Sequence, residues 1–109
     1  MPTMKPRYYI LDAENKPVPV DLHTWGETFG NFTSRNVGST QVTSQVTVST
    51  VFLGLDHRLI GEGPPLLFET MIFGGPLDQQ MWRYSSWDDA VVGHGMAVEK
   101  ARKSHLGVS

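Results

Sequence analysis

The alternation of hydrophobic and polar residues predicts two strands in the middle of the chain. From Val46 the residues alternate between apolar and polar, and the apolar pattern becomes continuous at 51–53. That change is typical of a strand that is half exposed where it begins and buried on both faces where it ends. A second apolar run, 66–73, follows Pro64 and Pro65, which cannot continue a ladder of backbone hydrogen bonds. The two runs predict a hairpin whose first strand is central in a sheet.

Weaker patterns predict further extended segments. The aromatic and β-branched residues at 7–11 precede a turn-forming segment, so a first strand and a loop are expected there. Two prolines then hold Val18 extended. The polar stretch before the central strand predicts an exposed edge strand at about 37–43. Residues 81–84 are short enough to form an edge strand or an extended approach to the last helix.

Two segments have helical spacing. Asp21 is suited to be the N-cap of a short helix from 22 to about 29, with Leu22, Trp25 and Phe29 on one face. Ser86 and Asp89 form a variant of the capping box that begins a second helix, continuing to about residue 103. The apolar stripe of this last helix consists of Trp87, Ala90, Val91, His94, Val98 and Ala101.

Together these elements predict an α+β fold. It is an antiparallel β-meander of three to five strands with two helices, in the order β-α-β-β-β-(β)-α, with the C-terminal helix packed on the sheet. A chain of 109 residues is long enough to bury a core without staples and has the size of one domain. We expect a single domain over 1–109, with 1–6 and 105–109 flexible.

Composition excludes several classes of function. The chain has no cysteine, which rules out disulfides, thiolate zinc sites and cysteine nucleophiles. The N-terminal segment lacks the apolar core of a signal peptide, and no later run could span a bilayer, so we expect a cytoplasmic protein without membrane contact. A formal charge of −2 does not favour nucleic-acid binding. The basic cluster of Lys100, Arg102, Lys103 and His105 complements the dipole at the end of the last helix.

Four residues are candidates for chemistry. Asp56 and His57 close the central strand and point to opposite faces if the extended conformation continues that far. In a tight register that pairs residue 57 with 66, Glu69 lies opposite Gly54 and diagonal to Asp56. Two carboxylates in that position could share general acid and base roles, although a solvated outer face is the leading interpretation of Glu69.

The fourth candidate is His94, inside the apolar stripe of the last helix. A buried imidazole needs a hydrogen-bond partner, which Asp56, Glu69 or a backbone carbonyl could supply. A satisfied core histidine is favoured over a ligand or general base. No spacing supports a metal site built from His57, His94 and carboxylates, so neither a metal nor a cofactor is predicted. No phosphate cradle or nucleophile elbow is present in the sequence either.

The tryptophans and tyrosines are better suited to a core or a protein interface than to stacking on bases, because no basic surface is interleaved with them. We assign Trp25 and Trp87 to the core. Trp82 and Tyr84 remain open between these two roles.

Four long motifs give the chain a family resemblance. They are residues 8–12, 49–57 and 64–75, and 83–87 followed by Ala90, Gly93 and His94. In these motifs the chain resembles a family of small uncharacterised proteins encoded by tailed bacteriophages and prophages. The first helix matches only partly, since the family has Ala at the position of Gly26 and a second Trp near Thr28. The resemblance implies an origin and no reaction, so no site residue carries over from it.

Three functions are therefore weighed. The leading one is a non-enzymatic phage accessory protein that binds a host or phage protein in the cytoplasm of the bacterial host. The second is a small hydrolase or metal-dependent enzyme using Asp56, His57, Glu69 and His94, which requires these residues to converge in one cleft. The third is a minor virion or assembly component, which predicts a symmetric oligomer. Whether the protein forms a homo-oligomer is left open.

Overall fold

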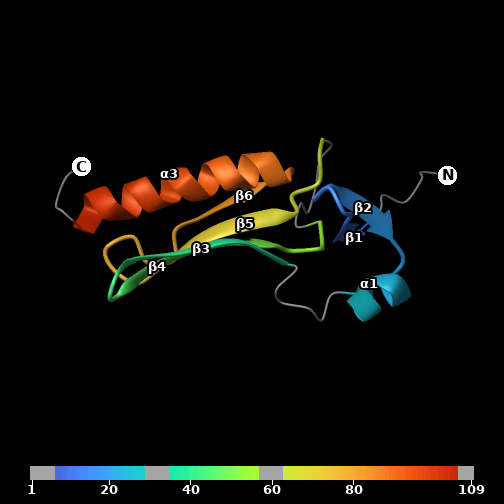
Figure 1. Ribbon diagram of the computed structural model, residues 1–109, viewed down its shortest axis with the longest axis horizontal. Coiled ribbons are helices and arrows are strands. Elements are labelled where there is room, and N and C mark those ends of the chain that lie inside the picture. Colours follow the sequence, from blue (N-terminus) through green and yellow to red (C-terminus); the bar gives the residue numbers. More distant parts are fainter. Residues whose placement is uncertain (1–6, 29–34, 57–62, 106–109) are drawn as a thin grey trace.

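The computed structural model describes residues 7–28, 35–56 and 63–105, and it confirms the α+β fold (Figure 1). The larger region is a four-stranded antiparallel sheet whose order is β3 (Asn36–Thr43), β4 (Val46–Phe52), β5 (Phe68–Phe73) and β6 (Met81–Tyr84). Helix α3 (Trp87–His105) packs along one face of this sheet, as predicted. The smaller region contains the two-stranded sheet of β1 (Tyr8–Leu11) and β2 (Pro17–Val20) with helix α1 (Leu22–Thr28). No helix in these ranges is both long and apolar enough to span a bilayer.

The central strands divide their side chains between two faces. Buried and half-buried residues alternate along β4, so that Val46, Val48, Thr50 and Phe52 face α3. The helix meets them with Ala90, Ala97 and Ala101, all of which are buried. Small side chains on α3 let its backbone approach the sheet closely. The opposite face of the sheet carries half-buried and exposed residues that α3 does not cover.

The register of β4 and β5 differs from the one predicted. Glu69 pairs with Val51, and Phe52 pairs with Phe68, so Glu69 does not lie opposite Gly54. The central strand ends at Phe52 because Gly54 has a φ of 75°, a left-handed conformation that turns the chain out of the ladder. The predicted antiparallel pairing of these two strands is confirmed, whereas the tight register that pairs residue 57 with 66 is wrong.

The sequence pattern missed strand β2. Pro17 and Pro19 lie within it. Proline has no backbone N–H to donate, so it is found in a strand only where one edge of that strand is not paired. β2 satisfies that condition because it pairs with β1 in a two-stranded sheet. The Asp12 carboxylate shapes the turn by accepting hydrogen bonds from the backbone N–H groups of Glu14 and Lys16, at 2.8 and 3.0 Å. These bonds hold the pKa of Asp12 below its ordinary value.

The smaller region is attached through β1. The Tyr9 N–H donates to the Gly54 carbonyl at 2.8 Å, and the Tyr9 ring joins the cluster around Phe52 and Phe68. This is the close backbone approach that a glycine at position 54 suggests. On the far side of β1, the Tyr8 and Trp25 rings lie 5.4 Å apart and connect α1 to the hairpin.

Both helix caps are confirmed, and both predicted apolar faces need correction. Asp21 accepts from the Thr24 N–H at 2.7 Å and Ser86 accepts from the Asp89 N–H at 3.1 Å. The short helix α1 buries none of its residues, and Leu22 is 58% exposed. Phe29 lies outside the described residues. In α3, Val91 is 48% exposed, since it lies at the edge of the stripe that faces the sheet.

Candidate functional site

His94 anchors α3 to the sheet through two threonines. Its Nε2 lies 2.8 Å from the Thr40 Oγ1 on β3, and its Nδ1 lies 2.7 Å from the Thr50 Oγ1 on β4. The Thr50 hydroxyl is also hydrogen-bonded to the Thr70 hydroxyl on β5. A neutral imidazole donates from one nitrogen and accepts at the other, so both ring nitrogens are satisfied by hydroxyls. These four residues form a polar chain across three strands.

Burial around His94 favours the neutral imidazole. Desolvation lowers its pKa below the ordinary value of 6.5. A side chain at position 38 would place its Cβ 3.2 Å from the His94 Nε2, so Gly38 makes room for the ring. Thr50 and Thr70 are fully buried, whereas Thr40 and His94 are half-buried. The arrangement therefore supports the interpretation of His94 as a satisfied core histidine.

Glu69 lies on the other face of the sheet from His94. Its neighbour Thr70 faces α3, and alternation along β5 directs Glu69 the opposite way. The Glu69 Oε2 accepts from the Arg83 Nε at 3.0 Å, and the two side chains are 17% and 30% exposed. This ion pair crosses directly between paired residues of β5 and β6.

Asp56 has a structural role in the connection after β4. Its Oδ1 accepts from the Leu66 N–H at 3.1 Å, and its own N–H donates to the Arg7 carbonyl at 3.1 Å. His57 lies outside the described residues. The candidates that can be placed do not converge, since the sheet separates Glu69 from His94. Among the residues that the structure describes, no three histidines or carboxylates are grouped to hold a metal ion.

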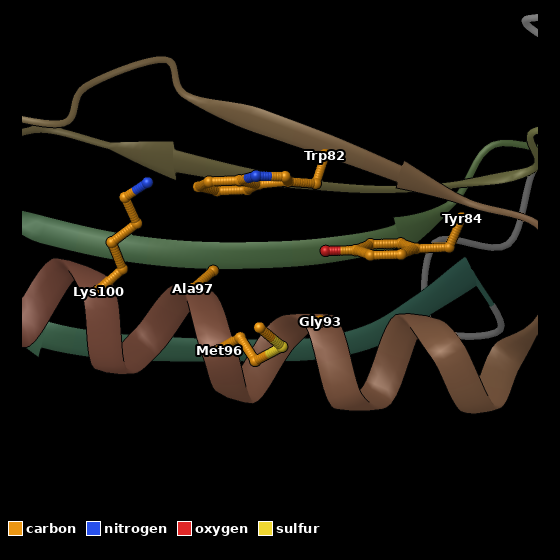
Figure 2. Close-up of a pocket in the computed structure, with 6 residues that line it drawn as sticks. All are labelled: Trp82, Tyr84, Gly93, Met96, Ala97 and Lys100. Atoms are coloured by element: carbon orange, nitrogen blue, oxygen red, sulfur yellow. The ribbon is translucent and has the colours of Figure 1, made fainter.

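A different feature forms a hollow surface, the groove between α3 and β6. It has a volume of about 250 Å³ and its walls are mainly apolar. Figure 2 shows the Trp82 and Tyr84 rings extending from β6 beside the helix, with Met96 and Lys100 on the helical side. We call this surface the α3/β6 groove, and its residues are Trp82, Tyr84, Gly93, Met96, Ala97 and Lys100. The mainly apolar walls are suited to contact with apolar side chains of another protein.

Gly93 gives the groove its shape. A Cβ at this position would come within 2.2 Å of the Tyr84 hydroxyl, so the absence of a side chain lets the tyrosine ring lie against the helix backbone. One turn later Met96 is 69% exposed, and the neighbouring Val92 is 64% exposed. The Lys100 Nζ lies 5.4 Å from the centre of the Trp82 ring, within the range of a cation–π contact.

Sequence reasoning did not single out this groove. It left Trp82 and Tyr84 open between a core and a protein interface. Val92 and Met96 are spaced by four residues and lie outside the stripe that packs on the sheet. This exposed apolar pair on α3 was the sequence feature that could have indicated a binding surface.

Comparison with known proteins gives no match to this chain: no family model, no curated protein and no solved structure is significantly similar to it.

Proposed function

We propose that this chain is a non-enzymatic protein-binding module and that the α3/β6 groove is its binding surface. The observation that carries the proposal is the exposed apolar pair Val92 and Met96 beside the hollow lined by Trp82 and Tyr84. Aromatic residues and methionine are enriched where proteins bind one another. Methionine also adapts its shape to different partners.

The polar candidates support the same choice. Asp56, Glu69 and His94 each hold part of the fold together, and the sheet keeps Glu69 apart from His94. Their geometry gives an enzyme mechanism no support. Following the resemblance to phage proteins, we place the partner, a host or phage protein, in the cytoplasm of an infected bacterium.

Site-specific photocrosslinking tests this proposal. A photoreactive benzoylphenylalanine replaces Met96 in one variant and Val91 in the other, and each variant is expressed in bacterial cells. Val91 is the matched control because it is an exposed apolar residue of the same helix outside the groove. The proposal expects one reproducible protein adduct from position 96 that position 91 does not give.

A competition experiment makes the result specific to the groove. An excess of the protein without the photoreactive residue should suppress the adduct at position 96. An excess of the Met96→Asp protein should not suppress it, because the aspartate places a charge in the apolar surface. Equal adducts from positions 91 and 96, or no adduct from either, would contradict a binding role for the groove.

A further inference from the structure

Resting on the binding role proposed above, we propose that the α3/β6 groove binds an extended peptide segment that adds antiparallel to β6. An apolar side chain of this segment lies between Trp82 and Met96. An acidic group that follows it in the peptide lies beside Lys100.

The first support is the free edge of β6. Trp82 pairs with Thr70, and the Ile72 N–H donates to the Gln80 carbonyl at 3.0 Å. Because hydrogen-bonded groups alternate along an antiparallel ladder, the N–H and C=O groups of Met81 and Arg83 point away from β5. β6 pairs with β5 alone among the described strands. Such an edge is a template for strand addition by an extended peptide.

The opposite edge of the sheet is less suited to a peptide. β3 has irregularities of register between Asn36 and Gly38 and between Gln41 and Thr43, which bend an edge away from regular pairing. On this side of α3 the His94 ring also packs against Gly38. β6 has no such irregularity over its four paired residues. The regular edge and the groove therefore coincide on the β6 side.

The direction of side chains in a strand paired with β6 determines which residues of the peptide enter the groove. Trp82 and Tyr84 lie on the α3 side of the sheet, two residues apart. In a strand paired with β6, every second side chain also projects to that side. There it meets Trp82, Met96 and Ala97, whose surfaces in the groove are mainly apolar. An aliphatic side chain is the matching occupant.

Charge sets the orientation of the peptide. Lys100 lies beside Trp82, near the beginning of β6, and Lys103 is one turn further along the same side of α3. Within the described ranges neither lysine forms an ion pair with a carboxylate, whereas Arg102 is paired with Glu99 at 2.9 Å. A strand antiparallel to β6 has its C-terminal end at this basic end of the groove. The acidic group therefore follows the apolar residue.

Four synthetic peptides test the inference by fluorescence anisotropy. Three are labelled, C-terminally amidated octapeptides of alternating valine and serine that end in two aspartates, two lysines or two serines. The fourth is the aspartate peptide with alternate amides N-methylated, which removes the donors needed for strand pairing. We expect the aspartate peptide to bind about ten-fold more tightly than the lysine peptide. We also expect N-methylation to abolish its binding.

Charge reversal in the protein provides the second arm. Lys100→Glu should remove the preference for the aspartate peptide and shift it toward the lysine peptide. Lys16→Glu is the matched control, because it makes the same charge change in the β1–β2 turn, where Lys16 is 74% exposed. Equal affinity for the aspartate and lysine peptides would overturn the inference. So would retained binding of the N-methylated peptide, or the same response from both variants.

The two proposals fail separately. A groove-specific adduct at position 96, together with equal binding of the aspartate and lysine peptides, would support the binding role of the groove. The same result would contradict the proposal that the bound segment is acidic. Selective binding of the aspartate peptide without any adduct in cells would support the chemistry of the groove and contradict the proposed role in those cells.

Discussion

The two sides of helix α3 differ in how they contact the sheet. On the β3 side, His94 spans the interface and its two ring nitrogens lie 2.8 and 2.7 Å from threonine hydroxyls. On the β6 side, the helix leaves a groove of about 250 Å³ and exposes Met96 and Val92. One side is therefore organised to hold the helix in place, while the other leaves apolar surface uncovered. Under the proposed binding role, the β3 side fixes the helix through buried hydrogen bonds, and the β6 side supplies the binding surface.

The largest expected effect comes from removing the anchor. His94→Ala eliminates two hydrogen bonds and leaves a cavity beside buried Thr50, so the free energy of unfolding should fall by about 2–4 kcal/mol. Met96→Ala, on the exposed side, should change it by no more than about 0.5 kcal/mol. Urea denaturation of both variants measures the contrast. Similar losses for the two would contradict the division between the sides of α3.

A pair of glycines in α3 should respond with opposite signs. Gly93→Ala forces the Tyr84 ring out of its place, and overpacking of this kind costs about 1–3 kcal/mol. Gly95 has open space around its Cβ position, so Gly95→Ala should stabilise the helix by about 0.5–1 kcal/mol. Thermal unfolding of the two variants distinguishes them. If Gly93→Ala also raises the melting temperature, Tyr84 does not pack as described.

A smaller effect should appear in the dependence of stability on pH. Burial lowers the pKa of His94 below 6.5, so the unfolded chain binds a proton at this residue more readily than the native protein does. The contribution of neutral His94 to the free energy of unfolding is fully present above about pH 6.5. It is lost as the pH falls toward the lower pKa that His94 has in the native protein. Urea midpoints between pH 7.5 and 5.5 should decrease in the natural protein. They should decrease less in His94→Gln, and identical slopes would contradict the assignment.

The smallest effect on stability is expected from Met96→Asp. Because Met96 is 69% exposed, the aspartate remains solvated, and the unfolding free energy should stay within about 0.5 kcal/mol of the original. Any loss of binding by this variant then reports on the groove rather than on folding. A cooperative transition at an unchanged urea midpoint is the required control. A large decrease would mean that Met96 belongs to the core.

The sequence was sufficient to predict most elements and the antiparallel order of the central strands, and insufficient to predict the register of β4 and β5. Alternation identified β4 as central, and side-chain capping placed the beginnings of α1 and α3. The register could not be predicted because it depends on the left-handed turn at Gly54, which periodicity does not report. The partners of His94 were also missed. They are threonines on two strands, and hydroxyls at alternating positions of a strand do not stand out as a site.

The most direct test of the two-sided account is an NMR titration of ¹⁵N-labelled protein with the aspartate peptide. We expect amide shifts at Met81 and Arg83 on β6 and at Gly93 and Lys100 on α3. We expect no shift at Gly38 or Thr40 on the β3 side. Shifts centred on β3, or shifts absent from β6 while the peptide is bound, would contradict the claim that α3 anchors on one side and binds on the other.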